Sequence, residues 1–248
     1  MHVAITGASS GIGHALAKRF AEKGYAVTII ARRKNKLEEL AKSLETRVSV
    51  QQADLSDLKQ ATAWVEAAEK ALGPIDVIIN IAGMQYVAAA ETISDEEAEK
   101  LLRLNVSAPM RIINRVLPTM QERGTGTIVN IASLSAIAKL PGMAHYSASK
   151  AALANYSETL RIELKQSKVK VLTVYPGPVE TPMAEASLEN LDSGLANLTP
   201  MGTPDKLAHL IFNSLGKKRL IYPSMYALQF TFPNISQFFI EKFAPMPG

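Results

Sequence analysis

Cysteine is absent from the 248 residues of the chain. This absence excludes disulfides, zinc–thiolate sites, iron–sulfur clusters and cysteine nucleophiles. It also favours a cytoplasmic location, because disulfides are characteristic of oxidising compartments. The first residues enter an apolar, strand-like segment at once, without a charged leader or a cleavage site. We therefore expect no signal peptide.

Long apolar runs and long basic tracts are lacking as well. No segment approaches the roughly 18 apolar residues that a membrane-spanning helix needs, so we predict no membrane span. The 27 Lys and Arg residues barely exceed the 23 Asp and Glu residues, and the longest basic tracts are residues 32–34 and 217–219. We expect neither a nucleic-acid partner nor a metal site. The 47% hydrophobic and 20% charged residues are typical of a globular protein.

Strand-like and helix-like segments alternate along the chain. We expect strands at residues 3–6, 25–30, 48–52, 75–80, 127–131 and 169–174, and helices at 12–23, 35–44, 58–72, 94–120 (kinked at Pro109) and 147–166. The strands are continuous apolar runs, which are typical of a parallel sheet covered on both faces. The pattern predicts an α/β fold: a doubly wound, Rossmann-type three-layer sandwich with a mostly parallel central sheet, in one domain over residues 1–248.

A glycine-rich segment joins the first strand to the first helix, with the spacing G-x-x-x-G-x-G. A helix N-terminus favours an anion, and side chains there would block a diphosphate from the backbone amides. Turns also use glycine, but this position favours a dinucleotide site. The residues expected to contact the diphosphate are Gly7, Ser9, Ser10, Gly11, Ile12 and Gly13.

The end of the second strand indicates which nicotinamide cofactor binds. A carboxylate there would bind the adenosine 2′-hydroxyl and repel a 2′-phosphate. The chain has Arg32 and Arg33 there, and the nearest acid is Glu38. Because arginine forks pair well with phosphate, we predict NADP(H) in preference to NAD(H), with Arg32 as the first contact and Arg33 as the second. An ordinary basic helix entry is the alternative.

Taken together, motifs over about residues 1–215 resemble those of the short-chain dehydrogenase/reductase family. They are the glycine loop at 6–13, Asp54, the Asn80-Ile81-Ala82-Gly83 segment, Asn105, Ser133, Tyr146-Ser147-Ala148-Ser149-Lys150, and Pro176-Gly177 with Thr181. The family commonly has a second asparagine where this chain has Ile81. That departure bears on local packing and cofactor affinity, and it does not touch the hydride-transfer residues.

Tyr146 and Lys150 stand four apart on one expected helix, so they share a face. A free tyrosine has a pKa of about 10, and a nearby ammonium favours its phenolate. Tyr146 is therefore the expected acid/base. The Ser133 hydroxyl, after the fifth strand, would hold the substrate oxygen. The resemblance implies that Lys150 also binds the nicotinamide ribose and that Asn105 supports a water-linked proton relay; a local hydrogen bond is the alternative role for Asn105.

Further cofactor contacts are implied by the resemblance. Those expected near the adenosine are Asp54, Leu55, Asn80, Ala82 and Gly83, and those expected near the nicotinamide are Tyr146, Lys150, Pro176, Gly177, Val179 and Thr181. Asp54 has an alternative role as a helix N-cap. We expect His14 and His145 to be non-catalytic.

The sequence predicts an NADP(H)-dependent oxidoreductase that interconverts a carbonyl and a secondary alcohol. Narrower alternatives are a β-ketoacyl-thioester reductase and a hydroxysteroid dehydrogenase. An alternative from another class is a catalytically silent NADPH-binding regulatory protein, against which the intact Ser133, Tyr146 and Lys150 argue.

Two segments are expected to serve the substrate and the assembly. Residues 182–203 resemble a substrate lid, and their leucines and methionines favour an apolar small-molecule substrate. The C-terminal segment, residues 221–248, holds five of the seven phenylalanines. We expect it to pack on the body or at the interface of a homodimer or homotetramer; a substrate-pocket wall and peripheral membrane docking are alternatives.

Overall fold

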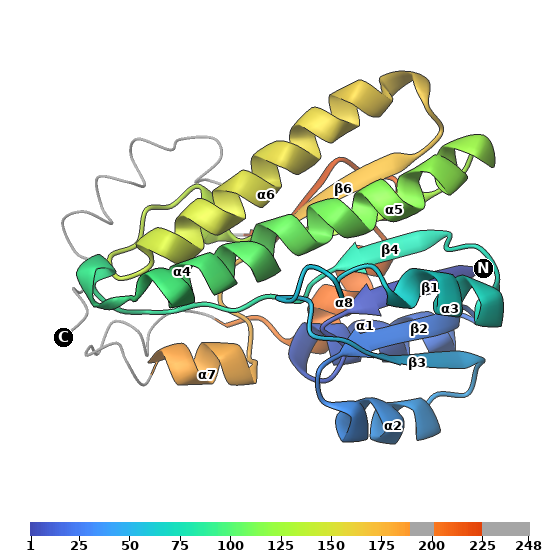
Figure 1. Cartoon of the computed structure of the whole chain (residues 1–248), viewed down its shortest axis with the longest axis horizontal. Helices are drawn as coiled ribbons and strands as arrows, with labels where there is room; N and C mark the ends of the chain where they lie inside the picture. Colours follow the sequence, from blue (N-terminus) through green and yellow to red (C-terminus); the bar gives the residue numbers. More distant parts are fainter. Residues whose placement is uncertain (189–200, 225–248) are drawn as a thin grey trace.

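A parallel sheet organises the chain. A computed structural model describes residues 1–188 and 201–224, and all structural statements refer to these. Within them, seven strands pair in the order β3-β2-β1-β4-β5-β6-β7, and all pairings are parallel (Figure 1). The strands are β1 (His2–Thr6), β2 (Ala26–Ala31), β3 (Val48–Gln52), β4 (Val77–Asn80), β5 (Thr127–Ile131), β6 (Lys170–Pro176) and β7 (Arg219–Tyr222). The order reverses between β1 and β4, which is where a doubly wound sheet binds ligands.

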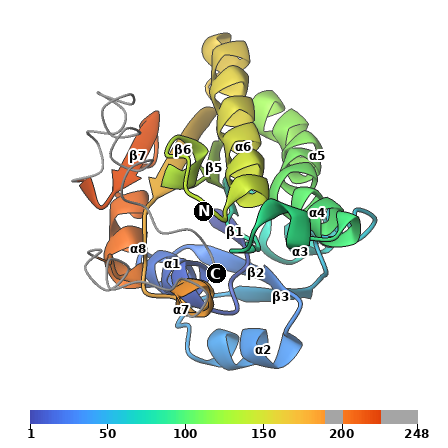
Figure 2. The ribbon, with the colours of Figure 1, turned by 90° about the vertical axis from the view of Figure 1, so that its left-hand side faces the viewer.

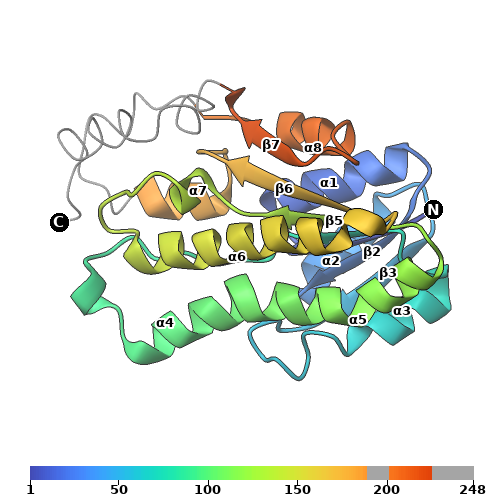
Figure 3. The ribbon, with the colours of Figure 1, turned by 90° about the horizontal axis from the view of Figure 1, so that it is seen from above.

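Helices cover both faces of this sheet (Figures 2 and 3). One apolar core lies between the sheet and α1 (Gly11–Glu22), α2 (Lys34–Lys42) and α8 (Pro204–Phe212). The other lies between the sheet and α3 (Trp64–Leu72), α5 (Ala108–Glu122) and α6 (Ala144–Glu163). Strand residues alternate between them: Val3 and Ile5 join the first core and Ala4 joins the second. Burial on both faces explains the continuous apolar runs and confirms the doubly wound sandwich.

Two expected helices differ from the structure. The helix expected at 58–72 begins only at Trp64. Before it, the Asp54 and Asp57 carboxylates accept hydrogen bonds from the backbone two residues ahead, at Ser56 and Lys59, both at 2.9 Å. Such local bonds give the backbone an alternative to the helix.

The helix expected at 94–120 is interrupted. α4 (Asp95–Leu102) leads into a π-helical turn, Arg103–Ser107, and then into α5. The irregularity expected at Pro109 takes the form of this widened turn, which ends shortly before the proline. Pro109 has no N–H to donate to the carbonyl four residues earlier, and the helix widens there instead. The strand β7 and the helix α8 were not expected.

The predicted lid and tail lie partly outside the described residues. The lid contributes α7 (Pro182–Leu188) and residues 201–203; residues 189–200 and 225–248 are not described. The two ends of the lid meet, because Val179 bridges to Gly202 and the Glu180 N–H donates to the Gly202 carbonyl at 2.9 Å. Among the described helices, none is long and apolar enough to cross a membrane.

The buried His2 imidazole makes stability depend on pH. Its Nδ1 lies 2.7 Å from the Gly73 carbonyl oxygen, and its Nε2 lies 2.8 Å from Thr28 Oγ1. Burial lowers the pKa of His2 below 6.5, although Gly73 and Asp76 oppose the shift. As the pH falls below about 6.5, His2 is therefore protonated more readily in the unfolded chain than in the folded chain.

We expect the free energy of unfolding, measured with urea, to fall between about pH 7.5 and about pH 5.5. His2→Gln should make this fall shallower. His14→Gln, at a partly buried site on α1, is the control and should change it less. An unaltered pH dependence in His2→Gln would contradict the assignment.

Candidate active site

The glycine loop after β1 packs against two other loops. Gly7 has a φ of +70°, and a Cβ there would lie 2.9 Å from the Ala82 backbone. A Cβ on Gly13 would lie 2.4 Å from the Gly7 carbonyl oxygen, and one on Gly11 would lie 3.0 Å from Thr181 Cγ2. At the start of α1, the Ser10 side chain makes no capping hydrogen bond. The first-turn amides thus remain available to an anion, as a diphosphate cofactor requires.

Arg33 lies over this loop. Its Nη2 donates to Ser9 Oγ at 2.9 Å and to Ser10 Oγ at 2.8 Å. Arg32 instead accepts a hydrogen bond at its carbonyl from Gln52, at 3.1 Å, and its charge acts on Asp54. The structure therefore places Arg33 against the glycine loop, and the expectation that Arg32 is the first contact of the 2′-phosphate stays a prediction.

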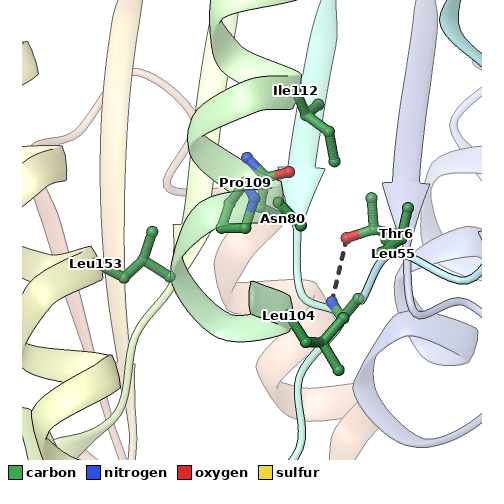
Figure 4. A pocket seen from close by; sticks show the side chains of 9 residues that line it. Thr6, Leu55, Asn80, Leu104, Pro109, Ile112 and Leu153 are labelled. Atoms are coloured by element: carbon green, nitrogen blue, oxygen red, sulfur yellow. Dashed lines mark hydrogen bonds between the residues drawn. The ribbon is translucent and has the colours of Figure 1, made fainter. Parts of the chain in front are cut away.

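The residues after β3 and β4 surround a small cavity beneath the loop (Figure 4). Leu55, Thr6 and Asn80 line it together with residues from α5 and α6. The Asn80 amide donates to Asn130 Oδ1 at 2.9 Å, and its own Oδ1 has no hydrogen-bond partner among the described residues. The Oδ1 atom of the Asp54 carboxylate accepts hydrogen bonds from Ser56 in its own turn, and the expected adenine contact of Asp54 stays a prediction.

Thr6 fixes the segment that follows β4. Its Oγ1 accepts hydrogen bonds from the Ile81 N–H at 3.0 Å and the Ala82 N–H at 3.1 Å. The Ile81 side chain packs on the core beside α1, so the departure from the family motif adds an apolar contact. Gly83 follows next, and a Cβ on it would lie 3.2 Å from Asn105 Oδ1 and 3.5 Å from Lys150 Nζ.

Ser133, Tyr146 and Lys150 come together at the carboxyl end of β5. Ser133 follows this strand, and Tyr146 and Lys150 are buried on the first turns of α6. The Ser133 hydroxyl is within hydrogen-bonding reach of the Tyr146 phenol, and it donates to the Pro176 carbonyl at 3.5 Å. Lys150 Nζ donates to the Ile131 carbonyl at 2.9 Å and lies 5.8 Å from the centroid of the Tyr146 ring.

Burial dominates the electrostatics of this cluster. It raises the pKa of Tyr146 to about 12, against the opposing hydrogen bond of Ser133. It lowers the pKa of Lys150 to about 8. Removing both groups from water thus favours their neutral forms in the chain alone. That Lys150 and a bound nicotinamide ring together lower the pKa of the tyrosine stays a prediction.

Asn105 lies in the π-helical turn and is buried beside the cluster. Its Nδ2 donates to the Met84 carbonyl at 2.8 Å, and its Oδ1 accepts from the Met84 N–H at 2.9 Å. Nδ2 also donates to Ser149 Oγ at 3.0 Å. Ser149 was missed as a site residue, although it stands inside the Tyr146–Lys150 segment.

The residues after β6 reach the same region. The Gly177 N–H donates to the Tyr222 carbonyl of β7 at 2.7 Å, so this amide serves the sheet instead of a ligand. Thr181 Oγ1 donates to the Val179 carbonyl at 3.1 Å and accepts from the Ala184 N–H at 3.2 Å. Thr181 and Gly11 thus join the β6 loop to the glycine loop.

Two histidines lie in the first turns of α1 and α6. His14 is partly buried on α1, and burial lowers its pKa. The buried Nδ1 of His145 has no hydrogen-bond partner among the described residues. Within the same residues, no group of three or more His, Asp or Glu side chains could hold a metal ion.

Comparison with known proteins identifies the family. Residues 1–192 match the family model described as short chain dehydrogenase. The chain belongs to the short-chain dehydrogenase family. An oxidoreductase of Staphylococcus saprophyticus is 35% identical over 185 residues, covering 73% of this chain and 79% of its own.

Two solved structures are similar to this short-chain dehydrogenase in sequence and in fold. A short-chain dehydrogenase from Sphingobium yanoikuyae in complex with NADPH has 31% identity and a TM-score of 0.82, covering 97% of this chain and 95% of its own. A 3-ketoacyl-(acyl-carrier-protein) reductase from Brucella melitensis complexed with NADH has 27% identity and a TM-score of 0.80, covering 89% and 96%.

The short-chain dehydrogenase site fits a nicotinamide dinucleotide. The glycines whose Cβ atoms would collide with neighbouring backbone leave room for close approach, and the uncapped start of α1 suits the diphosphate. Arg33 and the serines beside it would hold the adenosine end, and Lys150 would hold the nicotinamide end.

We expect the Lys150 side chain to titrate near pH 8 in the cofactor-free protein, because burial lowers its pKa to about 8. A carbon-13 NMR titration of its Cε, assigned with Lys150→Met, measures this directly. Lys36, which is exposed on α2, provides the control resonance. A midpoint for Lys150 at the ordinary lysine pKa of about 10.4 would contradict the result.

Proposed function

We propose that the chain is an NADP(H)-dependent oxidoreductase that interconverts a carbonyl and a secondary alcohol. The observation that carries this proposal is the convergence of Ser133, Tyr146 and Lys150 at the carboxyl edge of the sheet. This edge is where doubly wound folds bind ligands, and the glycine loop opens onto it.

The bound nicotinamide would supply or accept the hydride at the carbonyl carbon. In reduction, the electron pair of the carbonyl double bond moves to oxygen, which takes the proton of the Tyr146 phenol. The Ser133 hydroxyl donates to the same oxygen and holds it beside the phenol. Lys150 then returns a proton toward Tyr146, with Asn105 beside it. A pKa of about 12 keeps the phenol protonated at neutral pH, so its proton is available for donation to the substrate oxygen.

Arg33 and Arg32 support the preference for NADP(H). Both guanidinium groups lie after β2, and no carboxylate stands at that position to repel a 2′-phosphate. The serine hydroxyls that Arg33 contacts would share the phosphate with it. The two solved relatives hold NADPH in one case and NADH in the other, so this preference rests on the arginines.

The substrate and the assembly belong to the same proposal. Met183 on α7 is 40% exposed and Leu140, before α6, is 37% exposed, which supports an apolar substrate. A homodimer or homotetramer stays the assembly that we propose from the sequence. The absence of cysteine supports a cytoplasmic location. Likeness to the Brucella reductase favours a β-ketoacyl thioester as a narrower substrate.

We expect purified protein to oxidise NADPH with at least one member of a panel of ketones, aldehydes, quinones, steroids and β-ketoacyl thioesters. Tyr146→Phe should lower kcat by about 10²–10⁴-fold, the range of general acid–base catalysis, while NADPH still binds. Turnover is followed by NADPH absorbance and binding by NADPH fluorescence. Tight NADPH binding without turnover of any member by wild-type protein would favour the regulatory alternative.

We expect Arg33→Ala to weaken NADPH binding by about tenfold or more, because a hydrogen bond to a charged group contributes about 1.5–3 kcal/mol. NADH binding should stay unchanged. Arg32→Ala, the matched control from the next position, should weaken NADPH binding less. Titration of cofactor fluorescence with both cofactors checks this, and equal loss for NADPH and NADH in Arg33→Ala would contradict a 2′-phosphate contact.

A further inference from the structure

Ser149 connects the catalytic helix to Asn105. It is fully buried on α6, between Tyr146 and Lys150 in sequence. Its Oγ donates to the Tyr146 carbonyl oxygen at 2.7 Å and accepts from Asn105 Nδ2 at 3.0 Å. A single hydroxyl therefore ties the backbone of the proposed acid/base to the amide in the π-helical turn.

The direction of these bonds determines how Asn105 is oriented. A serine hydroxyl has one proton, and the Tyr146 carbonyl takes it, so toward Asn105 the oxygen can only accept. Asn105 must then present Nδ2 to Ser149. The Met84 backbone requires the same orientation, since its carbonyl accepts from Nδ2 at 2.8 Å and its N–H donates to Oδ1 at 2.9 Å. Both N–H groups of the amide are thus used.

The amide oxygen of Asn105 borders the same space as the Lys150 amino group. Its Oδ1 accepts one hydrogen bond from Met84 and can accept a second. Oδ1 and Lys150 Nζ both border the space beside Gly83, at 3.2 Å and 3.5 Å from the point where a Cβ would stand. An oxygen dipole facing this space favours the ammonium and can hold a water between the two groups.

We propose that Ser149 is a positioning residue that holds Asn105 Oδ1 toward the Lys150 amino group, and so supports the return of a proton to Tyr146. This role rests on the proposed function. Ser149 touches neither the substrate nor the cofactor in this account. It acts through Asn105, so its loss should slow the proton step and leave substrate and cofactor binding intact.

Ser157 offers a matched control two turns further along α6. It is also fully buried, its Oγ donates to the Leu153 carbonyl at 2.6 Å, and it accepts from Asn130 Nδ2 at 2.8 Å. Removing either hydroxyl leaves a buried asparagine N–H without its acceptor, so the two losses of stability should be similar. Of the two serines, only Ser149 is hydrogen-bonded to Asn105, which borders the space beside Lys150.

The first experiment compares Ser149→Ala with Ser157→Ala in steady-state kinetics across pH, using a carbonyl that wild-type protein reduces. We expect Ser149→Ala to lower kcat roughly tenfold, less than the about 10²–10⁴-fold of the acid/base itself, with KM unchanged. The limb of its pH profile that reports Lys150 should move to lower pH, because the ammonium loses a facing dipole. Ser157→Ala should keep the wild-type kcat and profile.

A double-mutant cycle then tests whether Ser149 acts through Asn105. The loss caused by Ser149→Ala should largely disappear in an Asn105→Ala background, whereas additive losses would overturn the proposal. Hydrogen exchange of the Met84 amide provides a readout independent of activity. It should accelerate in Ser149→Ala and stay unchanged in Ser157→Ala.

The remaining outcomes are distinguishable. Wild-type kcat and pH profile in Ser149→Ala would overturn the positioning role and leave the proposed function intact. Absence of NADPH-dependent turnover by wild-type protein would overturn both. If Ser149→Ala does not fold, Ser149→Thr replaces it, because threonine keeps the hydroxyl. A wild-type pH profile in Ser149→Thr supports the positioning role. A folded Ser149→Thr protein whose Met84 amide exchanges slowly but whose kcat is tenfold lower overturns it.

Discussion

The burial of the Lys150 amino group is the constraint around which the site is arranged. The side chain is 4% exposed, and no carboxylate among the described residues pairs with it. A buried charge without a counter-ion is costly, so its pKa falls to about 8 and backbone dipoles provide the compensation. The Ile131 carbonyl at the end of β5 accepts from it directly. The oxygen of Asn105 also lies on this side, where Gly83 has no Cβ to come between them.

The fold supplies these partners from separate parts of the chain. β5 provides the Ile131 carbonyl and Ser133, α6 provides Tyr146 and Lys150, and the π-helical turn provides Asn105. Because the strands are parallel, their carboxyl ends meet at one edge, and the glycine loop after β1 opens there too. Burial favours a neutral Lys150 amino group and a protonated Tyr146 phenol. A charged nicotinamide ring bound beside them would shift the pKa of both groups.

Much of the fold and part of the candidate site could be predicted from the sequence. Continuous apolar strands and the glycine spacing indicate the doubly wound sheet and its ligand-binding edge, and the Tyr146–Lys150 interval indicates a shared helical face. The sequence does not show where hydrogen bonds from a side chain to the local backbone replace the backbone hydrogen bonds of a helix. Asp54 and Asp57 delay α3 because their carboxylates bond to the local backbone in place of the helix. The exact extent of the π-helical turn before Pro109 is likewise not marked in the sequence.

The sequence also does not show in which direction a side chain points or how deeply it is buried. Arg32 and Arg33 are adjacent and chemically identical, and only the backbone at the end of β2 decides which one lies on Ser9 and Ser10. The pKa of Tyr146 depends on how deeply it is buried, which its spacing from Lys150 does not reveal. The role of Ser149 could not be predicted from the sequence either, because it depends on a hydrogen bond from Asn105, which is 44 residues away in sequence.

We propose that this chain moves a hydride between NADP(H) and a carbonyl carbon. Deuterium placed at the transferable position of the NADPH nicotinamide ring tests it most directly, with mass spectrometry of the alcohol formed. We expect one deuterium on the carbinol carbon of the product, and none on its oxygen after exchange into water. Alcohol without deuterium at that carbon, formed while the labelled cofactor is consumed, would contradict it.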